Sequence, residues 1–96
     1  MTGGRQRIDL WLFRARFAKT RAAAARLIGE GGVRLVRDGA ARRLEKPSTE
    51  VSAGDAILFP RRGVLVAVRV ERLPERRGPP GEARLLYSEV DADALA

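Results

Sequence analysis

The side chains best suited to chemistry in this chain occupy one short segment, which contains Arg16, Lys19, Thr20 and Arg21. The hydroxyl of Thr20 can accept a hydrogen bond from an unpaired amide of a helix that begins at Arg21, which is the role of an N-cap. The positive end of a helix and nearby cationic side chains attract the same ligand, an anion. The segment is therefore a candidate anion-binding corner, and the alternative interpretation is a solvated helix corner.

Catalysis has few candidate residues in this sequence. Histidine and cysteine are both absent, which removes thiolate metal ligands, disulfides and the commonest general bases. The acids Asp9, Glu30, Asp38 and Asp55 show no paired spacing typical of an acid–base site. A chain of 96 residues also has little room for a large catalytic cleft. We therefore predict a binding protein with no enzymatic activity, no cofactor and no metal.

The charge of the chain is positive and unevenly distributed. The formal net charge is +7, and residues 1–48 carry 12 basic and 4 acidic side chains, whereas residues 49–96 carry 7 and 8. Such a patch suits nucleic acid, an anionic membrane surface or an acidic protein. A long basic amphipathic stripe is lacking, which disfavours the membrane and the adaptor for an acidic protein. Without a signal-peptide core or a membrane-spanning apolar run, we expect a cytoplasmic protein.

Two helices must position the corner. Apolar residues recur at i, i+3, i+4 and i+7 from Ile8 to Ala15 and again from Ala24 to Gly31, which is the spacing of one helix face. Glycines 29, 31 and 32 end the second helix. Because the connection is so short, we predict that the two helices pack against each other. At this spacing Trp11 and Phe17 are interpreted as core residues, with stacking on RNA bases as the alternative.

Strands are predicted after the helices. Residues 33–36 and about 41–45 flank Asp38-Gly39, a strong signal for a two-residue hairpin, and Lys46-Pro47-Ser48 ends the second strand. Residues 56–59 form a short apolar run, and the alternation over residues 64–70 is typical of a strand with its valine face in the core. The arginines near the turns, residues 61, 62, 76 and 77, are interpreted as solvated.

The sequence also predicts how the chain is divided into segments. Residues 1–6 resemble a disordered basic tail, and residues 7–75 are expected to form the binding domain with its sheet extension. Residues 76–96 are expected to form a basic linker and a C-terminal amphipathic helix over about residues 82–90. The predicted fold class is α+β, with two packed N-terminal helices, a small mostly antiparallel sheet and a C-terminal helix.

Four motifs occur in this order along the chain: Arg7-x-Asp9-x-x-Leu12, Thr20-Arg21-x-x-Ala24-x-x-Leu27-Ile28-x-x-Gly31-x-Val33, Lys46-Pro47-Ser48 and Gly54-Asp55. Together they resemble the RNA-binding domain named after small-subunit ribosomal protein S-four, also called the alpha-L motif. The resemblance covers roughly residues 7–55, and within the family the first helix and the corner are most similar to those of small ribosome-associated heat-shock proteins of about fifteen kilodaltons.

The resemblance implies a protein that binds structured ribosomal RNA of the large ribosomal subunit, with tRNA as a further candidate partner. We expect the protein to be a monomer. It also implies a role in rescue or recycling of stalled subunits that carry peptidyl-tRNA under heat stress. The alternatives are ribosome assembly, ribosome quality control and general nucleic-acid binding, including DNA. The residues expected to contact RNA are Arg7, Arg16, Lys19, Thr20, Arg21, Arg34 and Lys46.

Overall fold

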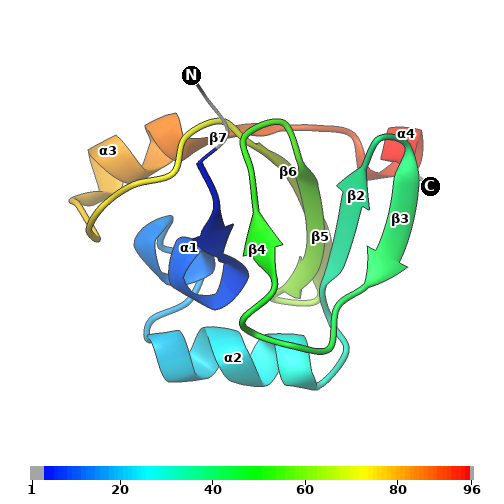
Figure 1. The fold of residues 1–96 in the computed structure, drawn as a ribbon, viewed down its shortest axis with the longest axis horizontal. Helices are drawn as coiled ribbons and strands as arrows, with labels where there is room; N and C mark the ends of the chain where they lie inside the picture. Colours follow the sequence, from blue (N-terminus) through cyan, green and yellow to red (C-terminus); the bar gives the residue numbers. More distant parts are fainter. Residues whose placement is uncertain (1–3, 96) are drawn as a thin grey trace.

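A computed structural model describes residues 4–95 and shows an α+β fold (Figure 1). None of the described helices is long and apolar enough to cross a membrane. In chain order the elements are β1 (Gln6–Arg7), α1 (Ile8–Arg14), α2 (Arg21–Gly29), β2 (Arg34–Arg37), β3 (Ala40–Arg43), β4 (Glu50–Val51), β5 (Ala56–Arg61), β6 (Val64–Val70), α3 (Pro80–Ala83), a 3-10 turn (Arg84–Leu86), β7 (Tyr87–Glu89) and α4 (Ala92–Leu95).

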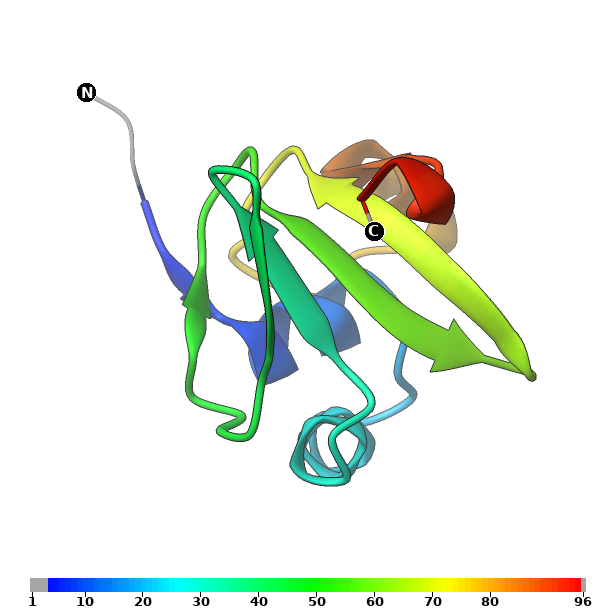
Figure 2. The same ribbon diagram turned by 90° about the vertical axis from the view of Figure 1, so that its right-hand side faces the viewer.

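The main sheet has five strands in the order β3-β2-β5-β6-β7, and all neighbouring strands are antiparallel. A separate two-stranded ladder joins β1 to β4. Figure 2 shows α1 and α2 on one side of the main sheet and α4 on the other. The predicted fold class, two packed N-terminal helices with a mostly antiparallel sheet and a C-terminal helix, is confirmed.

The apolar spacing of the two helices produces the core between them and the sheet. Ile8, Trp11 and Leu12 on α1 are fully buried, as are Ala24 and Ile28 on α2. Each large side chain buried in this way contributes about 1.5–3 kcal/mol. The indole Nε1 of Trp11 donates a hydrogen bond of 2.9 Å to the carbonyl of Arg72, so its polar atom is satisfied inside the core. The interpretation of Trp11 as a core residue is confirmed.

The predicted hairpin at Asp38-Gly39 is confirmed. Asp38 has φ 53° and Gly39 has φ 79°, the left-handed conformation that both central residues of a type I′ turn require. The return strand β3 runs over Ala40–Arg43, so it begins one residue earlier than expected and ends before Glu45. Leu44, directly after β3, is buried beneath the sheet edge.

The prediction of a helix over residues 82–90 is wrong in extent. One turn of α3 and a 3-10 turn are followed by β7, which pairs with β6 through Val68↔Glu89, Arg69↔Ser88 and Val70↔Tyr87. The unpaired edge of β6 offers backbone hydrogen bonds that a longer helix would leave unmade. Ala83 and Leu86 are buried as expected, because the helical spacing holds over the first two turns.

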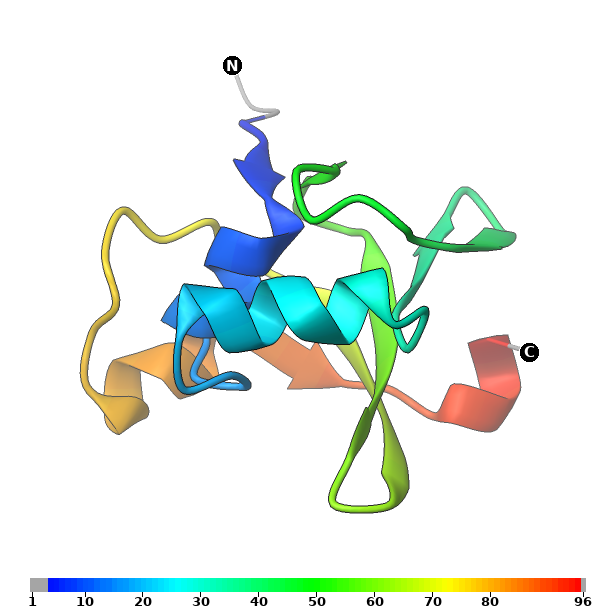
Figure 3. The same ribbon diagram turned by 90° about the horizontal axis from the view of Figure 1, so that it is seen from below.

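Two further expectations need correction. The chain is already ordered at Gln6, which lies in β1 and donates from Nε2 to the carbonyl of Pro74 at 2.7 Å, while residues 1–3 of the expected tail lie outside the described residues. The valine face of β6 is buried only at Val68 and Val70, since Val64 is 63% exposed. The hairpin between β5 and β6 extends beyond the helices, which therefore cover only its base (Figure 3).

Candidate nucleic-acid interface

The corner between α1 and α2 forms because the chain reverses at Arg16, which has φ 67°. The amides of Phe17 and Ala18 both donate to the carbonyl of Leu12, at 3.0 and 3.3 Å, and so close the end of α1. A left-handed residue followed by such bonds is the common way in which a helix stops. The next three residues then lead directly into α2, which places Lys19 exposed on the connection.

Thr20 is the N-cap of α2, as predicted. Its backbone is extended, with φ −141° and ψ 162°, and its Oγ1 accepts a hydrogen bond of 2.9 Å from the amide of Ala23. The amides of Arg21 and Ala22 point out of the first turn of the helix, where an α-helix has no internal acceptors for them. The start of α2 is therefore an exposed group of donors with partial positive charge.

The buried carboxylate of Asp9 binds two of the arginines that were predicted to contact RNA. Asp9 on α1 is 4% exposed and accepts two bonds from Arg7, at 3.1 Å from Nε and 2.9 Å from Nη2. Arg21 places its Nη2 3.8 Å from the same carboxylate. The side chains of Arg7 and Arg21 are still 46% and 49% exposed, so both present donors to solvent. In this geometry one buried carboxylate orients two cations.

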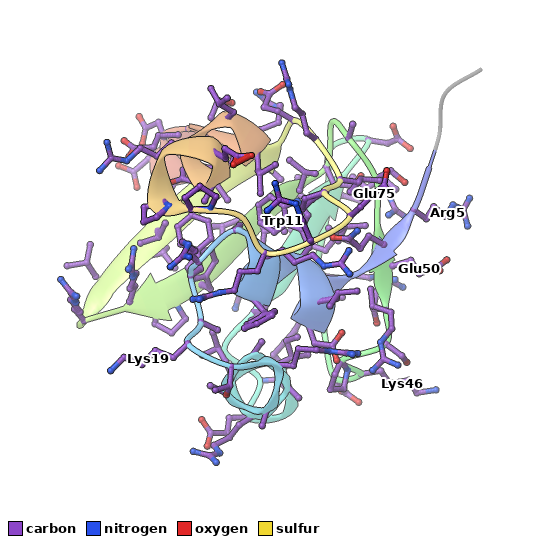
Figure 4. All side chains as sticks on the ribbon, turned by 90° about the vertical axis from the view of Figure 1, so that its left-hand side faces the viewer. Arg5, Trp11, Lys19, Lys46, Glu50 and Glu75 are labelled. Atoms are coloured by element: carbon purple, nitrogen blue, oxygen red, sulfur yellow. The ribbon has the colours of Figure 1, made fainter. Side chains whose placement is uncertain are left out.

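Lys46 reaches the same region through the loop before β4. The amide of Asp9 donates to the carbonyl of Pro47 at 3.3 Å, and that of Ile8 donates to Thr49 at 2.8 Å, so this loop covers the first turn of α1. Figure 4 looks along α2 from its N-terminal end and shows Lys19 and Lys46 pointing outward on opposite sides of the helix. Arg7, Lys19, Arg21 and Lys46 together are called the α2 cation cluster.

Arg16 has a different environment from the α2 cation cluster. Its Nε donates to the carbonyl of Gly78 at 2.8 Å, and Arg14 donates to the carbonyl of Pro74 at 2.6 Å. Arg77 donates to the carbonyl of Phe13 at 3.0 Å, with its guanidinium 4.7 Å from the centre of the Phe13 ring. The expectation that Arg77 is solvated is therefore wrong, because these bonds attach the segment 74–78 to α1.

Arg34 lies at the opposite end of α2, at the start of β2. The nine residues of α2 separate this end from Thr20 by roughly 13 Å. Arg34 is exposed and pairs in register with Arg43, whose side chain lies over Gly31, so that a Cβ placed there would be 3.4 Å from the Arg43 Cδ. The seven predicted residues thus divide into the α2 cation cluster with its Thr20 cap, Arg16 at the linker, and Arg34 at the start of β2.

Phe17 connects the corner to the sheet and reveals a neighbour that the sequence did not indicate. Its ring packs 5.0 Å from Phe59 and 4.6 Å from Tyr87, measured between ring centres, which confirms the interpretation of Phe17 as a core residue. The guanidinium of Arg61, at the end of β5, lies 5.5 Å from the centre of the same ring. No sequence signal could have found this contact, because 44 positions separate the two residues in the chain.

A second ion pair joins β2 to the turn before β5, where the buried carboxylate of Asp55 meets the partly exposed guanidinium of Arg37. Among the described residues, the α2 cation cluster forms ion pairs with Asp9 alone. Arg37 donates to both carboxylate oxygens of Asp55, at 2.9 and 2.7 Å, and the amide of Ser52 donates to the same carboxylate at 2.8 Å. Burial raises the pKa of Asp55, but these hydrogen bonds and the charge of Arg37 outweigh it, so the pKa lies below its ordinary value.

Comparison with known proteins places this geometry in a family. The S4 domain family matches residues 6–35. Heat shock protein 15 of Escherichia coli is 39% identical over 84 residues, which are 88% of this chain and 59% of that protein. The trimeric structure of heat shock protein 15 from Vibrio cholerae superimposes with a TM-score of 0.79 at 30% identity, and covers 96% of this chain and 87% of that one. The chain thus spans about 59% of the length of the curated relatives it matches.

Proposed function

Because this chain belongs to the S4-domain family that includes heat shock protein 15, we propose that it binds structured ribosomal RNA of the large ribosomal subunit. The observation that carries the proposal is the α2 cation cluster. Arg7 and Arg21 share the carboxylate of Asp9 beside the capped N-terminus of α2, and Lys19 lies on the connection that leads into this helix. Lys46 lies in the loop that covers the first turn of α1, so exposed charges and backbone donors occupy neighbouring elements. A phosphate of an RNA backbone satisfies both kinds of donor.

Shape favours structured RNA over a single phosphate ligand. The cations of the cluster come from β1, α2, the corner and the loop before β4, and Arg34 and Arg43 continue the positive surface beyond the far end of α2. Roughly 13 Å separates the two ends of that helix, which is a span of several nucleotides along a folded strand. The function is therefore binding and positioning of RNA, without an enzymatic step.

The more specific role proposed is rescue of stalled large subunits that carry peptidyl-tRNA under heat stress. Its support is the similarity to heat shock protein 15 over 88% of this chain. A cytoplasmic location follows from that role. The competing roles are ribosome assembly or quality control, and general binding of nucleic acid, including DNA. The α2 cation cluster suits all of these roles, so they are distinguished by which particle or nucleic acid the protein binds.

The test is co-sedimentation of the purified protein with ribosomal particles at physiological salt. We expect tighter binding to large subunits than to small subunits or duplex DNA, and tighter binding again to large subunits that hold a peptidyl-tRNA. Equal binding to duplex DNA would contradict the proposal and leave a general basic nucleic-acid-binding protein. Light scattering on the free protein tests the predicted monomer, and the trimeric Vibrio cholerae relative supplies the alternative.

A further inference from the structure

The hairpin between β5 and β6 presents an unusual combination of side chains at its tip. Val64 and Leu65 are 63% and 55% exposed, and they are two of the three exposed large apolar side chains among the described residues. Arg61 and Arg62 precede them and are exposed as well. No acidic residue occurs between Phe59 and Val70. The tip therefore offers positive charge and apolar surface together.

The backbone conformation of the turn disfavours an arginine at position 62. Arg62 has φ 53° and Gly63 has φ 79°, so both central positions are left-handed, as in the turn at Asp38-Gly39. Aspartate, asparagine and glycine are the residues that adopt this conformation readily, and an arginine there is disfavoured. Arginine at this place is thus better explained by what its side chain contacts than by the turn.

The tip is continuous with the α2 cation cluster. Arg61 stacks on Phe17, which precedes Lys19 by two positions in the corner. Figures 2 and 3 both show the corner and the hairpin tip extending toward the same side of the molecule. Because Arg61 and Val64 are paired across the hairpin, Val64 lies on the face of the sheet that carries the helices. An RNA bound at the corner can therefore also reach the tip.

We propose that the β5–β6 hairpin tip is a second RNA-contacting element, in which Arg62 binds a backbone phosphate and Val64 packs against a ribose or an exposed base, while Leu65 adds apolar surface on the opposite face of the hairpin. This inference rests on the proposed binding of ribosomal RNA. The minor groove of an RNA helix is wide and shallow and displays its riboses, so a narrow hairpin can enter it. The absence of acidic residues at the tip favours a polyanion over a protein partner.

The experiment measures binding of three variants to large ribosomal subunits and to the protein-free RNA extracted from them. Arg62→Asn removes one charge and supplies a residue that suits the left-handed turn. Val64→Thr with Leu65→Thr removes apolar surface and keeps strand propensity. Arg84→Asn is the matched control, since Arg84 is exposed, carries the same charge and lies in the turn after α3, on the side of the fold opposite α2 (Figure 1).

We expect Arg62→Asn to weaken binding to both probes about fivefold at 0.15 M salt, which is the counterion-release value of one phosphate, and to leave or raise the melting temperature. The double threonine variant should weaken binding without changing the salt dependence, and Arg84→Asn should change affinity less than twofold. Equal affinities of Arg62→Asn and Arg84→Asn would overturn the hairpin inference alone. Failure of the unaltered protein to bind either probe would overturn the proposed function and this inference with it.

A third result would also overturn the inference. If the double threonine variant lost affinity for whole subunits and kept full affinity for the protein-free RNA, the apolar tip would contact a ribosomal protein. Melting curves of all variants show whether each is folded at the temperature of the binding assay, and Arg62→Asn provides the decisive comparison if the double threonine variant is unstable.

Discussion

Replacing three members of the α2 cation cluster by glutamine tests where the RNA binds. Arg7→Gln, Lys19→Gln and Arg21→Gln remove three charges that lie within the first turn of α2 or beside it. Glutamine is chosen because its amide can still donate to the buried carboxylate of Asp9, which would otherwise lose its partners. The matched control replaces Arg72, Arg76 and Arg84 by glutamine, since all three are exposed and lie near α3.

The magnitude follows from counterion release. Each phosphate that a cation neutralises changes the slope of log K against log salt by about 0.7 to 0.9, so three lost contacts reduce the slope by roughly 2 to 2.7 units. At 0.15 M salt the same relation gives about fivefold per contact and on the order of 100-fold for three. Because Asp9 is buried, the loss of both cations costs stability, which the glutamine amides and the hydrogen bond from the amide of Leu10 offset in part. Affinities are therefore compared below the melting transition of the variant.

The assay is a salt titration of binding to large subunits, with circular dichroism melting curves on both triple variants. We expect the cluster variant to lose on the order of 100-fold in affinity and roughly 2 to 2.7 units of slope, whereas the control variant keeps its slope within about one unit. The two variants lose the same formal charge and differ only in its position. Equal losses of affinity would refute the α2 cation cluster as the site and leave only a diffuse positive field.

The other predictions concern stability. Thr20→Ala should lower the free energy of unfolding by about 1 kcal/mol, because the hydrogen bond of 2.9 Å to the N-terminal turn of α2 is lost, and Thr20→Ser in the same urea titration should retain most of it. The pKa of Asp55 is depressed in the folded state, so its contribution to the free energy of unfolding is present above the unfolded pKa of about 4 and is lost as the pH falls through the folded value. Melting temperatures measured between pH 6 and 2 should therefore fall more steeply for the unaltered protein than for Asp55→Asn. Parallel curves would contradict the ion pair with Arg37. Gly39→Ala should destabilise the protein by about 1–2 kcal/mol because φ is 79° at this position, although nothing lies within 4 Å of the added Cβ. The control is Gly29→Ala in α2, where the space is equally free, and it should be neutral or stabilising in the same titration.

The local features of the fold were predictable because the interactions that create them connect residues close in sequence. The cap at Thr20 bonds to an amide three residues later, the turn at Asp38-Gly39 depends on two neighbouring conformations, and the apolar spacing around Trp11 selects one helix face. The clustering of charge can be read from the sequence in the same way, so the sequence predicts that the corner binds an anion. Each of these features depends on interactions between residues of one short segment.

The tertiary structure alone decided which distant segments share a surface. Residues 87–89 became a strand because the edge of β6 was available, although their spacing continued a helical pattern. Arg77 stacks on Phe13 and Arg61 on Phe17, contacts that depend on the path of the linker and of the hairpin across the helices. The sequence alone determined that this chain has a capped, basic helix corner, and the fold decided which charges join it, because long-range contacts follow from packing that local spacing does not encode.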